Sequence, residues 1–234
     1  MQKINYLKVD IKKDSYLLID ICGTYVNENT TFGLLKSHFS RFTFKGLIIR
    51  SLTLKLSPLR IFMLVIEKFT GYHFLKNLLI LLIRGVSISS LEKSAIKYAK
   101  KLMKEKKYNN KKVVDFIYSH ISKSNPIFIS ASIEPIVKAI SSIEKIPYVA
   151  SSIEHIDNKY TGRISRDITR KKNIELMKKF NINLDLVNYY LVTDNLEDLD
   201  LAKNSLETLF ITNKKKAYLN KIYINQPNLK IESY

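Results

Sequence analysis

Three polar residues of this sequence directly follow short apolar runs, and each carries a carboxylate or hydroxyl group that can bind ligands or react. The runs at residues 17–19, 127–129 and 189–193 are followed by Asp20, Ser130 and Asp194. Such runs are typical of buried parallel strands, whose carboxyl ends meet at one edge of a sheet. We therefore expect the three side chains to converge at that edge, where such folds bind ligands. Taken alone, Ser130 is also typical of a helix N-cap, and an aspartate after a strand is typical of a turn.

Cys22 lies two residues after Asp20, beside the first candidate position, and it is the only cysteine of the chain. A single cysteine excludes an internal disulfide, so Cys22 is either a small packed side chain or a site residue. A thiol with a pKa of about 8.5 is neither a strong acid nor a strong base at neutral pH. The N-terminal residues lack an apolar stretch of signal-peptide length, and we expect a cytoplasmic protein.

The elements that must position these residues alternate between strand and helix. Strands are expected at 15–20, 127–129, 147–156, 189–193 and 208–211, with a hairpin arm at 158–164. Helical spacing covers 91–103, 133–140 and 167–180, and Ser89 with Glu92 forms a candidate capping box. This alternation predicts an α/β fold, a Rossmann-like parallel sheet with helices on both faces.

A helical insertion separates the first two strands. Asp20 and Ser130 are 110 residues apart, whereas a strand-helix-strand unit needs only about 30 residues. We therefore divide the chain into an α/β core, residues 1–31 and 121–234, and an inserted α-helical cap domain, residues 32–120.

The charge of the chain is concentrated in the predicted cap. Residues 36–112 carry 18 Lys and Arg against three acidic residues, in a chain whose net charge is +18. One interpretation is a lysine-rich codon bias with solvated lysines. The other is contact with an anionic molecule or surface. No stretch approaches the roughly 20 apolar residues of a membrane-spanning helix.

The polar positions resemble the four motifs of the haloacid dehalogenase (HAD) superfamily, in the same order. Residues 20–24, Asp-Ile-Cys-Gly-Thr, are similar to its first motif, usually Asp-x-Asp-Gly-Thr after an apolar strand. The second, third and fourth motifs are matched by Ser130, Lys172, and Asp194 with Asp198. The resemblance covers residues 15 to about 210, and the insertion lies where the phosphoserine-phosphatase-like branch carries its cap. Lys171 remains an alternative to Lys172.

The resemblance implies a Mg²⁺-dependent phosphoric monoester hydrolase that acts through an aspartyl-phosphate. Asp20 would be the nucleophile, and Ser130 and Lys172 would hold the phosphoryl group with help from Thr24. The implied Mg²⁺ ligands are Asp20, the main-chain carbonyl of Cys22, Asp194 and Asp198, the last directly or through water.

Cys22 departs from the family motif, because the usual second aspartate protonates the leaving group and then activates water. Losing such acid–base help typically costs on the order of 10² to 10⁴ in rate. The protein is then a phosphatase for good leaving groups, a phosphatase with a slower relay from Cys22 or the cap, or a phosphotransferase. Dehalogenase or phosphonate chemistry stays open, although the pair Asp194 and Asp198 argues against metal-free dehalogenation. In a further alternative, a catalytically impaired core serves as a binding scaffold.

The expected partner is a small phosphorylated substrate, selected by the cap that covers the site. The basic, partly apolar cap also fits weak association with an anionic ligand or a membrane surface. No nucleic acid is expected as a partner, because no recognised nucleic-acid-binding motif accompanies the charge.

Overall fold

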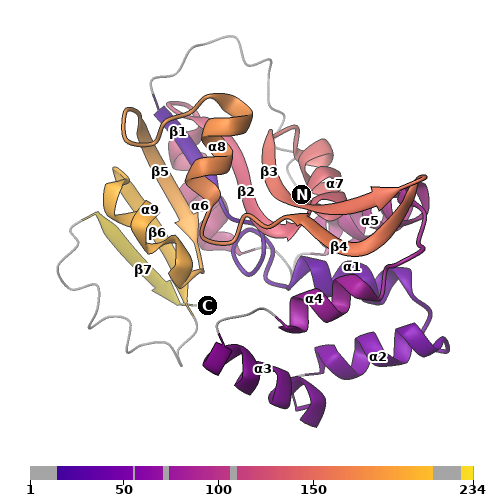
Figure 1. Ribbon diagram of the computed structural model, residues 1–234. Coiled ribbons are helices and arrows are strands. Elements are labelled where there is room, and N and C mark those ends of the chain that lie inside the picture. The colour runs from indigo at the N-terminus through magenta and orange to yellow at the C-terminus, as the bar shows by residue number, and fades with distance from the viewer. Residues whose placement is uncertain (1–14, 55, 71–73, 106–109, 213–227, 234) are drawn as a thin grey trace.

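A sheet of seven strands forms the centre of the computed structural model, which describes residues 15–54, 56–70, 74–105, 110–212 and 228–233 (Figure 1). The strands are β1 (Ser15–Ile19), β2 (Asn125–Ile133), β3 (Tyr148–Ile156), β4 (Lys159–Arg166), β5 (Asn188–Thr193), β6 (Glu207–Thr212) and β7 (Leu229–Ser233). Their order in the sheet is β4-β3-β2-β1-β5-β6-β7. All neighbouring strands run parallel except β3 and β4, which form an antiparallel hairpin.

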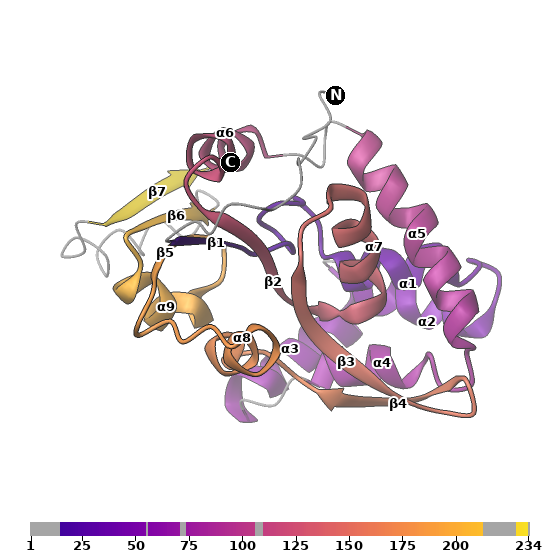
Figure 2. The ribbon, with the colours of Figure 1, turned by 90° about the horizontal axis from the view of Figure 1, so that it is seen from above.

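Helices cover both faces of this sheet (Figure 2). They are α1 (Thr30–His38), α2 (Phe44–Thr53), α3 (Pro58–Thr70), α4 (Phe74–Leu81), α5 (Ile88–Lys104), α6 (Lys111–Ile121), α7 (Glu134–Glu144), α8 (Lys172–Phe180) and α9 (Leu199–Asn204), with a 3-10 turn, η2 (Leu196–Asp198). On one face lie α1, α5, α6 and α7; on the other lie α8 and α9. The predicted α/β architecture is therefore confirmed.

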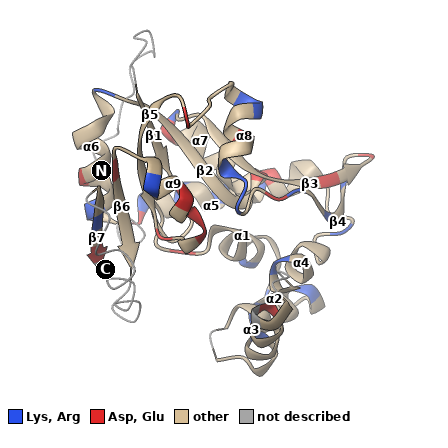
Figure 3. Ribbon diagram, turned by 60° about the vertical axis from the view of Figure 1, so that its left-hand side comes forward, with Lys and Arg blue, Asp and Glu red and all other residues tan. Residues whose placement is uncertain are grey.

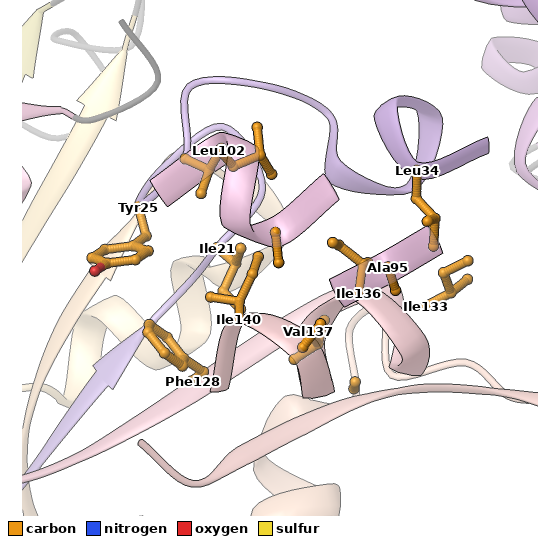
Figure 4. Close-up of a cluster of buried hydrophobic side chains, with 14 of the residues drawn as sticks. Ile21, Tyr25, Leu34, Ala95, Leu102, Phe128, Ile133, Ile136, Val137 and Ile140 are labelled. Carbon is orange, nitrogen blue, oxygen red and sulfur yellow. The ribbon is translucent and has the colours of Figure 1, made fainter. Parts of the chain in front are cut away.

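Strand β1 shows why its residues form a central strand. Leu17 and Ile19 belong to the larger apolar cluster, which also includes residues of α1, α5 and α7, whereas Leu18 belongs to the cluster under α8. All three side chains are fully buried. A strand covered on both faces reads as a continuous apolar run rather than an alternating one. Part of the larger cluster, where α5 and α7 meet β2, is shown in Figure 4.

Two expectations next to the site need correction. Strand β2 does not end at Ser130 but continues to Ile133, and Ile133 rather than Ser130 is the N-cap of α7. Helix α8 begins at Lys172 rather than near residue 167. The segment before it is a turn, in which the Asp167 carboxylate accepts the N–H of Thr169 at 3.0 Å.

Two further differences lie elsewhere in the chain. Helix α5 is capped by Ser87, whose Oγ accepts the Ser90 N–H, and not by the predicted box of Ser89 and Glu92. Strand β7 was not expected from the sequence; it pairs in parallel with β6 at the end of the sheet.

Helices α2, α3 and α4, here called the outer helices, lie beyond the carboxyl edge of the sheet (Figure 1). The preceding helix α1 is fixed to the core, because Thr31 Oγ1 accepts the Ile133 N–H at 3.3 Å. After α4, residues 85–88 pair with the β3–β4 hairpin: Gly85 N–H donates to the Tyr160 carbonyl, and Tyr160 N–H donates to the Val86 carbonyl. The outer helices are thus attached to the core at both ends.

The predicted division at residues 31/32 and 120/121 stays a prediction. Within the predicted insertion, α5 packs on α7 and α6 packs on β1. In the described part of the chain, no helix is both long enough and apolar enough to cross a membrane.

Candidate active site

Asp20 lies directly after β1, at the carboxyl edge of the sheet. Its backbone N–H donates to the Val192 carbonyl of β5 at 2.9 Å, and its side chain is buried, with only 4% of the residue exposed. The Thr24 hydroxyl donates to Asp20 Oδ2 at 3.2 Å. Asp20 is therefore held in place by a backbone bond to β5 and by Thr24 of the turn that follows β1.

The Lys172 ammonium lies between two carboxylates at this edge. It contacts Asp20 Oδ1 at 3.2 Å and Asp198 Oδ2 at 2.6 Å, and the residue is 3% exposed. Thr193 Oγ1 also donates to Asp198 Oδ2 at 2.6 Å. Lys171 is exposed to solvent. The structure thus places Lys172, and not Lys171, beside Asp20.

Burial and charge both shift the pKa values of this cluster. Burial raises the pKa of Asp20, Lys172 lowers it, and the neighbouring Asp194 and Asp198 raise it again, to about 7. Burial alone would lower the pKa of Lys172, but Asp20 and Asp198 raise it above its ordinary value. Lys172 therefore stays charged at neutral pH, while negative charge near Asp20 is only partly compensated.

Asp194 is the second carboxylate close to Asp20. Thr24 Oγ1 bridges the two, because it also lies 3.2 Å from Asp194 Oδ1. Gly23 has φ +79° and lets Asp194 approach the turn closely: a Cβ there would lie 2.3 Å from Asp194 Oδ2. Only glycine adopts this backbone conformation without strain and leaves that space open.

These residues fit a divalent cation. Asp20 and Asp194 are neighbouring carboxylates bridged by Thr24, and the charge of Asp194 raises the pKa of Asp20. The family resemblance adds the main-chain carbonyl of Cys22, two residues after Asp20. Hard oxygen ligands of this kind are those that Mg²⁺ prefers, with water or substrate phosphate completing the shell. Asp20, Asp194 and the Cys22 carbonyl would therefore hold such an ion.

Asp198 is placed differently from Asp194. Its Oδ2 is already bound by Lys172 and Thr193. Within the described ranges, no group of three or more His, Cys, Asp or Glu side chains is arranged to hold a metal. A role for Asp198 as a ligand, directly or through water, stays a prediction.

A cavity of 430 Å³ opens at this site between the core and the outer helices. The core contributes Asp20, Cys22 and Asp194 to its wall, and helix α3 contributes Arg60, Leu64 and Glu67. Its volume lies within the range of small-molecule sites, about 300 to 1,000 Å³. Helix α4 adds Leu75 and Lys76. Lys76 is paired with Asp167 at 2.9 Å, which ties α4 to the core.

Cys22 lines this cavity with a protonated thiol. Burial, and then the negative charges of Asp20 and Asp194, raise the pKa of Cys22 to about 12, although contacts with Thr30 and Ser132 oppose the shift. At neutral pH the sulfur is therefore neither a thiolate nucleophile nor a base.

Ser130 and Ser132 differ in their access to the cavity. Ser130 is fully buried, and its Oγ accepts the Ser132 N–H at 3.3 Å. Ser132 lines the cavity, and its hydroxyl lies 2.8 Å from that of Thr30. A phosphate-binding role for Ser130 stays a prediction, and Ser132 is a site residue that sequence reasoning missed. The signal was present, because the two serines are two residues apart and share one face of an extended strand.

The outer helices supply the other missed positions, including Arg60 and Glu67. No sequence motif marked them, because their place at the site depends on how α3 packs on α4 and α2.

Solved structures share the fold of this chain over nearly its whole length. The resemblance found in the sequence is confirmed at this level: the chain has the fold of HAD hydrolases, in the form found in phosphoserine phosphatases.

Solved structures support this assignment over nearly the whole chain. A Bordetella pertussis Tohama I protein of unknown function matches with a TM-score of 0.67 at 12% identity, over 94% of this chain and 98% of that one. A cytosolic 5'-nucleotidase IIIB bound to cytidine has a TM-score of 0.59 at 13% identity, over 94% and 80%. A phosphoserine phosphatase with a phospho-aspartyl intermediate analogue has a TM-score of 0.55 at 15% identity, over 95% and 94%. No family model and no curated sequence matches the chain.

Replacing the buried lysine should destabilise the protein. Lys172→Met leaves Asp20 and Asp198 buried without their cation, and we expect a loss of about 3 kcal/mol in the free energy of unfolding above pH 7. The folded-state pKa of Asp20 is raised from 3.8 to about 7. Lys172 lowers this pKa, so the pKa of Asp20 is higher still in the variant. Protonation then favours the folded state, and the loss should be largest at alkaline pH and shrink as the pH falls toward 7. Urea denaturation with a chelator present, at several pH values, measures this.

The matched control for this substitution is Lys171→Met, which changes an exposed lysine one residue away. Its effect should stay within about 0.5 kcal/mol at every pH. Equal losses in the two variants, or a Lys172→Met loss that does not depend on pH, would contradict the role assigned to Lys172.

Mg²⁺ should stabilise the folded protein through Asp194. At a concentration of about a hundred times Kd, binding to the native state adds about 2.7 kcal/mol, or roughly 5 to 10 °C in Tm for a chain of this size. Asp194→Asn should remove the shift, whereas Asp200→Asn should retain it, because the Asp200 side chain is 96% exposed. Thermal unfolding with and without Mg²⁺ measures it, and equal shifts in both variants would argue against the site.

Proposed function

We propose that the protein is a Mg²⁺-dependent hydrolase of phosphate monoesters that uses Asp20 as its nucleophile. One observation carries the proposal: Asp20, buried at the end of the central strand, lines a ligand-sized cavity while Lys172, Thr24 and Asp194 surround its carboxylate. The phosphatase structures that share the fold add support, although at 12–15% identity they establish the fold alone.

The steps follow from the residues around the cavity. One oxygen of Asp20 attacks phosphorus, the bond from phosphorus to the ester oxygen breaks, and an aspartyl-phosphate forms. Lys172 stays charged and is held beside Asp20, where it offsets negative charge that spreads over the phosphoryl oxygens. Thr24 orients the carboxylate. Water then attacks the aspartyl-phosphate, which releases inorganic phosphate and restores Asp20. A bound Mg²⁺ would supply further positive charge for the phosphoryl group.

Proton transfer is the step that this site supports least. The leaving oxygen needs a proton, and the attacking water must lose one. Cys22 stands where a carboxyl group would serve both needs, and a thiol is a weak hydrogen-bond donor. Glu67 of α3 is a carboxyl group on the cavity wall, although its Oε1 accepts the Leu75 N–H at 2.7 Å. We therefore propose slow turnover, fastest for leaving groups that need little protonation.

The cavity also bears on the substrate. Leu64 and Leu75 offer apolar surface, and Arg60 offers a cation close to them. The Arg60 guanidinium donates to the Thr53 carbonyl at 2.8 Å, which fixes its position. We propose a small phosphorylated molecule whose leaving group lies against α3 and α4.

Phosphate release from monoesters graded by leaving-group pKa tests this function. We expect Mg²⁺-dependent turnover that is lost in Asp20→Asn, which keeps size and shape while removing the nucleophile. Cys22→Asp should raise the rate for poor leaving groups by about 10²-fold or more and change it little for good ones. Glu67→Gln, measured on the same panel, tests whether the carboxyl group of α3 supplies the proton.

Circular dichroism of each variant controls for folding. Turnover that survives in Asp20→Asn would contradict the nucleophile assignment. A folded wild type without phosphate release that nevertheless transfers phosphoryl groups to an added alcohol would favour a phosphotransferase, and one inactive in both assays would favour a binding scaffold.

A further inference from the structure

Residues 42–69, which include α2 and α3, expose an unusual amount of apolar surface. Among the described residues, eight large apolar side chains are more than 60% exposed, and six of them fall within residues 42–69. We call these six the outer apolar surface: Phe42, Phe44, Leu54, Leu56, Phe62 and Phe69. Single exposed apolar residues are ordinary, but a concentration on one part of a molecule marks an interaction surface.

Helix α3 carries two of these six residues, Phe62 and Phe69. Its 13 residues, PLRIFMLVIEKFT, are mostly apolar, and every side chain described there is exposed or only half-buried. Phe62, Val65 and Phe69 are spaced to share one face of the helix, and their exposed fractions are 61%, 47% and 84%. The helix packs chiefly on α4 and α2 and lies far from the sheet (Figures 1 and 3). Its outward face therefore has no covering element among the described residues.

The segment that carries this surface is mostly basic, and its one acidic residue, Glu67, lines the cavity and accepts the Leu75 N–H. The sequence contains no Asp or Glu between Asn29 and Ile66, but it contains six Lys and Arg there. The guanidinium of Arg41 lies over the exposed ring of Phe42, 4.7 Å from its centre. Cationic and apolar groups are thus neighbours, the arrangement found in helices that lie at a lipid interface.

The positive charge helps to decide whether a second copy of the chain or an anionic bilayer covers the surface. A second copy of the chain, packed through the same surface, would bring two basic segments together. An anionic bilayer instead offers phosphates to the Lys and Arg side chains and an apolar interior to the phenylalanines. Charge complementarity therefore favours the bilayer.

We propose that the outer apolar surface docks on an anionic lipid bilayer, with α3 lying in the plane of the interface. Phe62 and Phe69 enter the boundary between headgroups and acyl chains, and Arg41 contacts the lipid phosphates. Helix α3 also contributes Arg60, Leu64 and Glu67 to the cavity wall. Docking would consequently place the cavity within about one helix diameter, 10 to 12 Å, of the bilayer surface.

Co-sedimentation of the full chain with lipid vesicles tests the docking. We expect binding to vesicles of equimolar phosphatidylcholine and phosphatidylglycerol, weaker binding to phosphatidylcholine alone, and a decrease with added salt. The double variant Phe62→Gln, Phe69→Gln should lower the partition coefficient by about tenfold or more, because it removes apolar groups without changing charge. Arg41→Gln should weaken binding to anionic vesicles only.

The matched control is Ile156→Gln with Leu186→Gln, which replaces two apolar side chains that are 63% and 81% exposed on other elements. This pair should bind like the wild type. Equal losses in both double variants, or no binding to anionic vesicles, would overturn the proposal. A second contrary result would come from light scattering. If the wild type is a dimer, the variant Phe62→Gln with Phe69→Gln is a monomer, and the wild type does not bind vesicles, the surface is a dimer interface and the proposal is overturned. Vesicle binding does not depend on catalytic turnover, so this experiment can fail or succeed independently of the test by phosphate release.

Discussion

The arrangement at the sheet edge depends on one buried ammonium group. Moving carboxylates out of water is costly unless a cation compensates them, and Asp20 and Asp198 are 4% and 2% exposed. Lys172 contacts both, and it comes from the first turn of α8 on the other side of the edge. This ion cluster therefore fixes three separate segments relative to one another: the end of β1, the 3-10 turn η2 that follows β5, and the start of α8. Thr24 and Thr193 complete it by donating to the same carboxylates.

Much of the core could be predicted, because a strand buried on both faces has a continuous apolar run in the sequence. Leu17, Leu18 and Ile19 form a continuous apolar run, and an abrupt change to Asp20 marks where the strand leaves the sheet. The same rule failed at β2, because a serine inside a strand looks like the end of one. The strand continues past Ser130 since its later residues still pair with β3 after a register shift, a tertiary effect that local pattern does not contain. Helical spacing before Lys172 misled for a similar reason: Ile168 is buried within a turn. Arg60 and Glu67 reach the cavity only through the packing of α3.

Cys22 lies in a site in which two other polar groups, Thr24 and Lys172, contact Asp20. A thiol is close in size to a short polar side chain and packs beside Ser132 and Thr30 without disturbing the turn. In the proposed function, binding of a phosphoryl group rests on geometry and charge, which Asp20, Thr24 and Lys172 supply. Proton transfer rests instead on the chemical type of the side chain at position 22.

The attachment of the outer helices at both ends limits how the site can be reached. A lid with one hinge swings clear of a site, but α2, α3 and α4 span from α1, bonded to β2, to residues 85–88, bonded to the β3–β4 hairpin. A segment that is attached at both ends can bend in its middle, but it has no free end that could swing away from the site. In the proposed function, the substrate enters a cavity whose wall α3 and α4 complete. A compact molecule fits there more readily than a phosphoryl group on the surface of a folded protein.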